Sequence, residues 1–171
     1  YKFWSTQPVP QLNRDCEINF GPLIKETNME SIKKDPYMLP EGFEWKEVDL
    51  SQSNEVDKLY EFLKSNYIGD ESHLFGMEHS KDFLKWYLSP PGMHKEWIIS
   101  VLKEDKVKNK KKMIGFICAI PCKISVIGTE VQLAKVNFLC VKKEFRNKRL
   151  TPVLIQEITR RVNLKNICKW I

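Results

Sequence analysis

Long apolar runs are missing from this sequence of 171 residues. The longest, such as Trp97–Leu102, fall far short of the ~20 residues that span a bilayer. No basic start followed by an apolar stretch marks a secretory signal. With only 7 glycines and 9 prolines, the chain is neither collagen-like nor of low complexity. The patterns GxxxxGKS/T and GxGxxG are also missing, which argues against P-loop NTPases and standard dinucleotide-binding folds.

The remaining composition is that of one globular domain. Hydrophobic residues make up 42% of the chain and charged residues 29%, which excludes strongly disordered classes. The net charge of +6 is modest, so it permits an anionic ligand without indicating a nucleic-acid partner. Five scattered cysteines, an odd number, favour a reducing compartment and hence a cytoplasmic protein. Because Tyr1 is not a methionine, we expect the native chain to begin earlier.

Hydrophobic periodicity predicts a mixed α/β chain of the α+β type. Residues 54–67 have the spacing of an amphipathic helix, and a shorter helix is predicted from Ser80 to the Pro90-Pro91 pair. Four stretches rich in Ile, Val and Phe predict strands: 97–103, 113–120, 123–127 and 131–141. Short turns let these strands pair as hairpins, and Pro121 suggests a bend or an edge position. We therefore expect a mixed, mostly antiparallel sheet flanked by helices.

A basic loop between the last strand and the last helix predicts a phosphate site. Arg146, Lys148 and Arg149 precede Thr151 and Pro152, which we expect to be the N-cap and first residue of the helix. Unpaired N–H groups and the helix dipole attract anions to such an end. This suits a pyrophosphate or a 3′-phosphorylated nucleotide such as coenzyme A. The alternative is a basic loop that caps an ordinary helix.

The layout of helices, antiparallel strands and a basic loop before a helix resembles the acyl-CoA N-acyltransferase (GNAT-like) fold. Within it, the chain resembles glycylpeptide N-tetradecanoyltransferase, or N-myristoyltransferase. The motifs that carry this resemblance are Lys2–Trp4, Thr6–Pro10, Asn137–Val141, Arg146 with Lys148-Arg149, Pro152–Ile155 and Glu157–Val162. The chain departs from the family's pattern at Lys135, at Lys142 and in the loop of residues 69–77.

The resemblance implies a division of the molecule as well as an activity. Residues 1–171 would form the N-terminal, acyl-CoA-binding half of a two-lobed enzyme that transfers myristate from myristoyl-CoA to the N-terminal glycine amine of proteins. The second lobe, and the C-terminal carboxylate that serves as the base, would lie outside this chain. We therefore expect the chain alone to bind myristoyl-CoA without turnover and to self-associate. No metal or prosthetic group is implied.

The resemblance also assigns roles to residues. The backbone N–H groups of Phe138 and Leu139 would stabilise the oxyanion, and Tyr67 and Phe75 would contact the peptide. The expected myristoyl-CoA contacts are Tyr1, Lys2, Phe3, Trp4, Leu139, Cys140, Val141, Arg146, Asn147, Lys148, Arg149, Leu150, Thr151 and Pro152.

Other interpretations of the same residues stay open. Cys140 could be a covalent nucleophile, although a packed thiol is the simpler interpretation because no histidine lies near it in sequence. Cys118 and Cys122 could begin a zinc site, but no second pair completes it. The lysines of residues 103–112 favour a solvated turn over a nucleic-acid site. The rival functions are a non-catalytic acyl-CoA-binding module and a basic nucleic-acid-binding domain.

Overall fold

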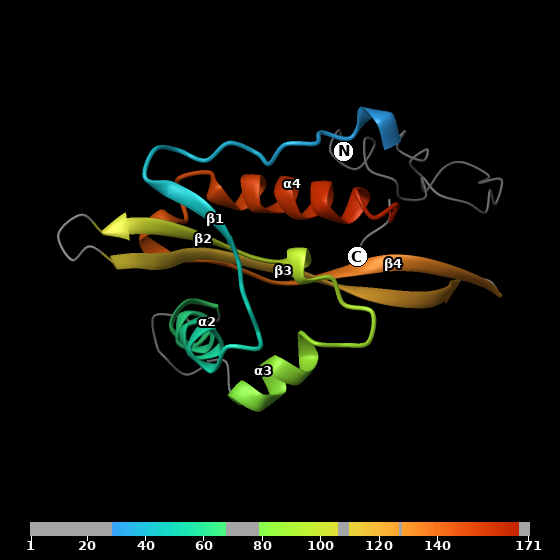
Figure 1. The fold of residues 1–171 in the computed structure, drawn as a ribbon, viewed down its shortest axis with the longest axis horizontal. Coiled ribbons are helices and arrows are strands. Elements are labelled where there is room, and N and C mark those ends of the chain that lie inside the picture. Colours follow the sequence, from blue (N-terminus) through green and yellow to red (C-terminus); the bar gives the residue numbers. More distant parts are fainter. Residues whose placement is uncertain (1–28, 68–78, 106–109, 127, 168–171) are drawn as a thin grey trace, which may run out of the picture.

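The computed structural model describes residues 29–67, 79–105, 110–126, 128–167 of the chain. A single antiparallel sheet lies between two layers of helices (Figure 1). Its strands, in the order β1-β2-β3-β4, are β1 (Phe43–Glu47), β2 (Ile98–Asp105), β3 (Lys110–Val126) and β4 (Thr129–Val141). The α-helices are α2 (Ser53–Asn66), α3 (Lys81–Tyr87) and α4 (Leu150–Asn163), and the 3-10 helices are η1 (Met29–Ser31), η2 (Lys95–Trp97) and η3 (Lys143–Phe145). The fold is therefore α+β, as predicted.

The alternation of side chains along the strands divides the core into two parts. On β3, Phe116 and Cys118 point to one face of the sheet and pack with α2 and α3, whose Leu59 and Leu84 are fully buried there. Between them, Ile117 points to the opposite face and packs with the apolar side of α4. Because both faces are covered, the middle of β3 is a continuous apolar run rather than an alternating one.

The prediction of two separate strands, 113–120 and 123–127, is wrong, because β3 runs through Pro121 as one strand. Pro121 pairs with Ala134 of β4, whereas the pairing of β2 with β3 ends at Cys118. On its other side, then, Pro121 has no neighbouring strand among the described residues, and its missing N–H costs no ladder bond. The expected edge position is thus confirmed. Beyond Cys118, β3 and β4 form a two-stranded arm (Figure 1).

Strand β1 was not predicted, because its alternation of aromatic and charged residues, Phe-Glu-Trp-Lys-Glu, covers only five positions within a proline-rich part of the chain. It pairs with β2 and is reached by residues 32–42, here called the strap, which run along α4 (Figure 1). Among the described residues, no helix combines the length and apolarity needed to cross a bilayer.

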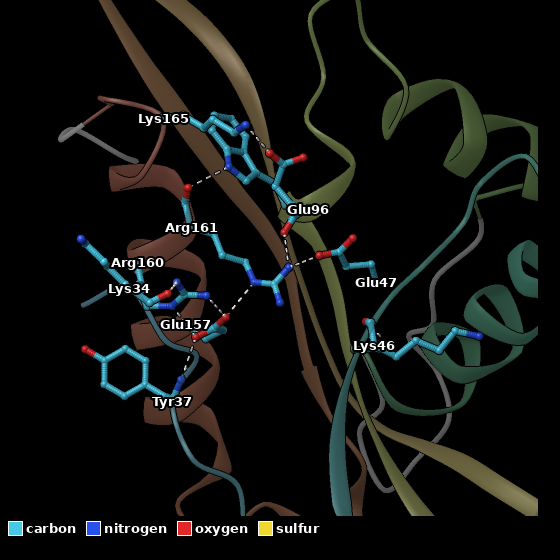
Figure 2. Close-up of polar contacts among 11 residues, drawn as sticks. Lys34, Tyr37, Lys46, Glu47, Glu96, Glu157, Arg160, Arg161 and Lys165 are labelled. Atoms are coloured by element: carbon cyan, nitrogen blue, oxygen red, sulfur yellow. Dashed lines mark hydrogen bonds and ion pairs between the residues drawn. The ribbon is translucent and has the colours of Figure 1, made fainter. Parts of the chain in front are cut away.

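A buried ion cluster holds the strap on α4 (Figure 2). Glu157, whose side chain is 0% exposed, accepts hydrogen bonds from Arg160, Arg161 and the backbone N–H of Tyr37. Arg160 also donates to the carbonyl of Lys34. The cluster joins residues up to 126 positions apart in the sequence.

Burial raises the pKa of the Glu157 carboxyl, but the hydrogen bonds from Arg160, Arg161 and Tyr37 outweigh burial and lower it overall. The carboxylate is therefore ionised and fully partnered at neutral pH. Such a cluster fixes the position of α4 relative to the strap.

Candidate functional site

The most unusual backbone in the described chain lies near the end of β4. Phe116 pairs with Cys140 and Cys118 pairs with Asn137, so Phe138 and Leu139 together face Ile117 alone. This is a β-bulge in which two residues oppose one. The first of the two, Phe138, has φ of 52°. A bulky residue rarely adopts the left-handed region, which costs on the order of 1–3 kcal/mol. Strain of this kind persists only where the surroundings enforce it, and it often marks a functional site.

A polar network surrounds the bulge. The Phe138 N–H donates to Oδ1 of Asn137 at 2.8 Å, and the Tyr67 hydroxyl donates to the same oxygen at 3.4 Å. Nδ2 of Asn137 donates to the Tyr87 hydroxyl at 3.0 Å, and the thiol of Cys118 donates to the Asn137 carbonyl. The rings of Tyr67 and Tyr87 pack against the ring of Phe138. Burial raises the pKa of Tyr67, so its hydroxyl remains protonated at neutral pH.

A cleft of about 280 Å³ opens beside this bulge. One wall is the bulge itself, with Asn137, Phe138 and Leu139, and the opposite wall comes from the middle of α4. The remaining lining residues are Tyr67, Ile117, Val136, Ile155, Ile158 and Thr159. The lining is mostly apolar with a few polar groups, as is typical of sites for small molecules.

The basic loop lies at the start of the same helix. The expectation that Thr151 caps α4 is wrong: the helix begins at Leu150, and its N-cap is Arg149, with φ of 55° and no side-chain cap bond. Pro152 is then the third helical residue, a position where a missing N–H is still harmless because the first four N–H groups have no partner in the helix. Ile155 and Ile158 follow the helix start by roughly 8–12 Å along the axis. One extended ligand could therefore contact both the loop and the cleft.

The cations of this loop are arranged differently from one another. Arg146 donates to the carbonyls of Asn66 at 2.6 Å and Val141 at 3.2 Å, so it joins the end of α2 to the end of β4. Lys148 lies over the ring of Phe145. All four residues of the loop, Arg146 to Arg149, are exposed. Among the cations, Arg149 and Lys148 are the better placed to meet a phosphate, because two donors of Arg146 are already used within the protein.

Cys140 packs as a buried thiol beside the bulge. Burial raises its pKa to about 11, although the nearby charge of Arg146 lowers it in part. Burial also raises the pKa of Cys118 strongly. A nucleophilic cysteine needs the opposite shift. The geometry thus favours the packed thiol over the nucleophile.

The burial of Cys118 and Cys140, which raises the pKa of both thiols, predicts a pattern of alkylation. At pH 7.5, iodoacetamide is expected to modify the half-buried Cys122 while Cys118 and Cys140 stay unmodified, because only a thiolate reacts. Mass spectrometry of the digested protein measures modification at each cysteine. Fast modification of Cys140 in the folded protein would revive the nucleophile interpretation. Urea-unfolded protein, in which all three react, is the control.

Comparisons with known proteins identify the family of this chain. The family model described as myristoyl-CoA:protein N-myristoyltransferase, N-terminal domain, matches residues 22–171. The chain belongs to this family. The glycylpeptide N-tetradecanoyltransferase of Dictyostelium discoideum is 46% identical over 167 residues, which are 98% of this chain and 39% of that protein. The protein of the same name from Plasmodium falciparum (isolate 3D7) is 43% identical, over 100% of this chain and 41% of its own length.

Solved structures of the family show the same fold. The crystal structure of Saccharomyces cerevisiae N-myristoyltransferase with bound myristoyl-CoA aligns with a TM-score of 0.80 and 40% identity, over 98% of this chain and 38% of that one. The GNAT-like acyltransferase fold is thereby confirmed. The chain spans about two fifths of the length of these relatives.

Several expected contacts of the N-myristoyltransferase site fall outside the described residues: Tyr1, Lys2, Phe3, Trp4 and Phe75. In the described part of the chain, no cluster of three or more His, Cys, Asp or Glu side chains could hold a metal ion. Sequence reasoning did not assign roles to Asn137, Tyr87 or Glu157. A charged residue within the apolar stripe of α4, between Leu154 and Ile158, was the available signal for Glu157.

Proposed function

We propose that this chain is the acyl-CoA-binding lobe of an N-myristoyltransferase, which transfers myristate from myristoyl-CoA to an N-terminal glycine amine. The observation that carries the proposal is the strained bulge at Phe138, which borders a cleft and lies one β–α connection away from a basic helix start. Family membership over residues 22–171 supports the same activity. The bound myristoyl-CoA of the yeast relative supports the ligand.

In this proposal, the phosphates of coenzyme A lie at the basic loop and the first turn of α4. Arg149 and Lys148 contribute charge, and the backbone N–H groups of the loop and helix contribute directed donors. Tyr1–Trp4, Leu139–Val141 and Arg146–Pro152 are the proposed contacts of the whole ligand. The helix axis then leads the acyl end of the ligand toward the cleft beside the bulge.

The bulge acts on the thioester carbonyl. The amine attacks the carbonyl carbon, the C–N bond forms, and negative charge develops on the oxygen before the C–S bond breaks and the thiolate of coenzyme A leaves. The proton that the amine nitrogen loses ends on this thiolate, so the products are the amide and free coenzyme A. Backbone N–H groups of Phe138 and Leu139 stabilise that charge, and one such donor is worth about 3–4 kcal/mol of barrier. A positive φ turns the N–H of Phe138 out of the regular ladder, which makes a strand N–H usable for this purpose. Tyr67 lies beside it as the proposed contact for the incoming peptide.

Calorimetry of the chain with myristoyl-CoA tests the proposal. We expect binding by the wild type and, for Arg149→Ala, a weakening of about 10- to 150-fold, because a charge-assisted contact is worth ~1.5–3 kcal/mol. Lys143→Ala is the matched control, since Lys143 is an exposed cation of the same segment but lies in η3. Arg149→Lys should retain most of the affinity.

Two outcomes would contradict this assignment. If the wild type does not bind myristoyl-CoA, the lobe is not an acyl-CoA site. If Arg149→Ala and Lys143→Ala bind equally well at low salt, the basic loop does not contact the phosphates, and the ligand must enter the cleft from elsewhere.

A further inference from the structure

The N–H of Phe138 already has an acceptor within the protein. Oδ1 of Asn137 lies 2.8 Å from the Phe138 nitrogen, so an acyl carbonyl that uses this N–H must displace the Asn137 oxygen. The strength of the proposed oxyanion site therefore depends on how firmly the Asn137 amide is held in place.

The orientation of that amide follows from its neighbours. A backbone N–H can only donate, so the Asn137 atom facing Phe138 must be the oxygen. The amide nitrogen then points the other way, where its Nδ2 meets the Tyr87 hydroxyl at 3.0 Å. Tyr87 is the acceptor in this bond. It comes from the end of α3, a different element from the bulge that it acts on.

The bonds of the amide to the Phe138 N–H and to Tyr87 are made and broken together, and the longer bond from the Tyr67 hydroxyl to Oδ1 is unchanged in Tyr87→Phe. The amide group is planar and rigid, so turning Oδ1 away from the Phe138 N–H also carries Nδ2 away from Tyr87. The bond to Tyr87 exists only while the Phe138 N–H is covered. A bond made in one of two states favours that state by its own free energy.

We propose that Tyr87 is a positioning residue that acts through Asn137 to set how readily the Phe138 N–H is released to an acyl carbonyl. The effect on an acyl carbonyl rests on the proposed function. The hydrogen bonds that link Tyr87 to the Phe138 N–H through Asn137 do not depend on a ligand. The rings of Tyr87 and Phe138 pack edge to face, with their centroids 5.5 Å apart. Tyr87→Phe keeps that contact and removes only the hydroxyl.

The first test measures release of the N–H directly. Hydrogen exchange of the Phe138 amide, followed by NMR, is expected to be about fivefold faster in Tyr87→Phe, because a neutral hydrogen bond contributes on the order of 0.5–1.5 kcal/mol. Tyr60→Phe is the matched control, since Tyr60 packs against the same core cluster but is not part of the Asn137 network. Equal exchange in Tyr87→Phe and the wild type would overturn the inference, whether or not the chain binds acyl-CoA.

The second test measures the consequence for a carbonyl. Two non-hydrolysable thioethers of coenzyme A are compared by calorimetry: one with a ketone separated from the sulfur by a single methylene group, and one with a methylene in place of that ketone. The affinity for the ketone divided by the affinity for the methylene ligand measures the contribution of the carbonyl contact. Effects of a substitution on the rest of the site cancel in this ratio. We expect Tyr87→Phe to raise this ratio about fivefold and Tyr60→Phe to leave it unchanged.

A double-mutant cycle separates this role from a general loss of structure. In Asn137→Ala, which removes the competing oxygen, Tyr87→Phe should change the ratio no further, because the two residues act in series. An equal rise in both backgrounds, or a fall of the ratio in Tyr87→Phe, would overturn the inference. A wild type that binds neither ligand would instead contradict the proposed function, and the exchange measurement would still decide the role of Tyr87.

Discussion

Glu157→Gln is expected to lower the free energy of unfolding by about 3–5 kcal/mol, because it leaves two guanidinium groups short of a buried counter-charge. The side chains of Arg160 and Arg161 are only 7% and 11% exposed, so water cannot replace the lost carboxylate. The neutral amide can accept one of their hydrogen bonds but supplies no charge. Urea denaturation of the two proteins measures the difference.

The control for this prediction is Glu47→Gln. Glu47 bonds the same Arg161, but its side chain is 52% exposed, and we expect less than about 1 kcal/mol. The pH dependence provides a second check. Because the pKa of Glu157 is lowered in the fold, its stabilisation is present above the unfolded pKa of about 4.3 and is lost as the pH falls through the folded value. The gap between wild type and Glu157→Gln should therefore narrow in acid, and a gap that widens in acid would contradict the assignment.

Leu154→Ala is expected to cost about 4 kcal/mol, toward the upper end of the range for large-to-small changes in a core. Leu154 is fully buried and packs over Gly115 of β3, where a Cβ would lie 3.2 Å from its Cδ1. Since glycine has no side chain that could move into the vacated space, the cavity cannot close from the sheet side. Val153→Ala, on the same turn but only partly buried, is the matched control and should cost much less.

The same contact predicts a change of sign between two backgrounds. Gly115→Ala alone should destabilise the protein slightly, because its methyl group would press on Leu150 and Leu154. In the Leu154→Ala background, the methyl group should fill part of the cavity and restore stability. Additive effects of the two substitutions would show that α4 does not pack on Gly115 as described.

Much of the fold could be predicted because it follows from local patterns. The amphipathic spacing of residues 54–67 places α2 correctly to within a residue or two, and Ser80 caps α3 by accepting from the N–H of Phe83. The resemblance to N-myristoyltransferase drew attention to Phe138 and Leu139, which the structure places at a strained bulge beside a cleft. No propensity of phenylalanine predicts that conformation.

The rest depends on contacts between distant segments. Strand β1 exists because it pairs with β2 and follows the strap, and neither fact is visible in its five residues. Arg146 appears in the sequence as a phosphate ligand, yet it donates to the carbonyl of Asn66, 80 positions away. The Asn137 network likewise joins β4 to two tyrosines that no spacing rule connects. Such pairs form only after the chain has folded, so local sequence cannot reveal them.

The attachment of the strap to α4 has a consequence for the order of folding. Strands β2, β3 and β4 are neighbours in sequence and form a meander of local hairpins, whose closure is fast. Tyr37 and Glu157, in contrast, are 120 positions apart, and the loop that joins them is entropically more costly to close. The meander can therefore form early as a template for α4. We therefore expect the strap to dock after the meander and α4 have packed, so that its charged anchor is among the last native contacts to form.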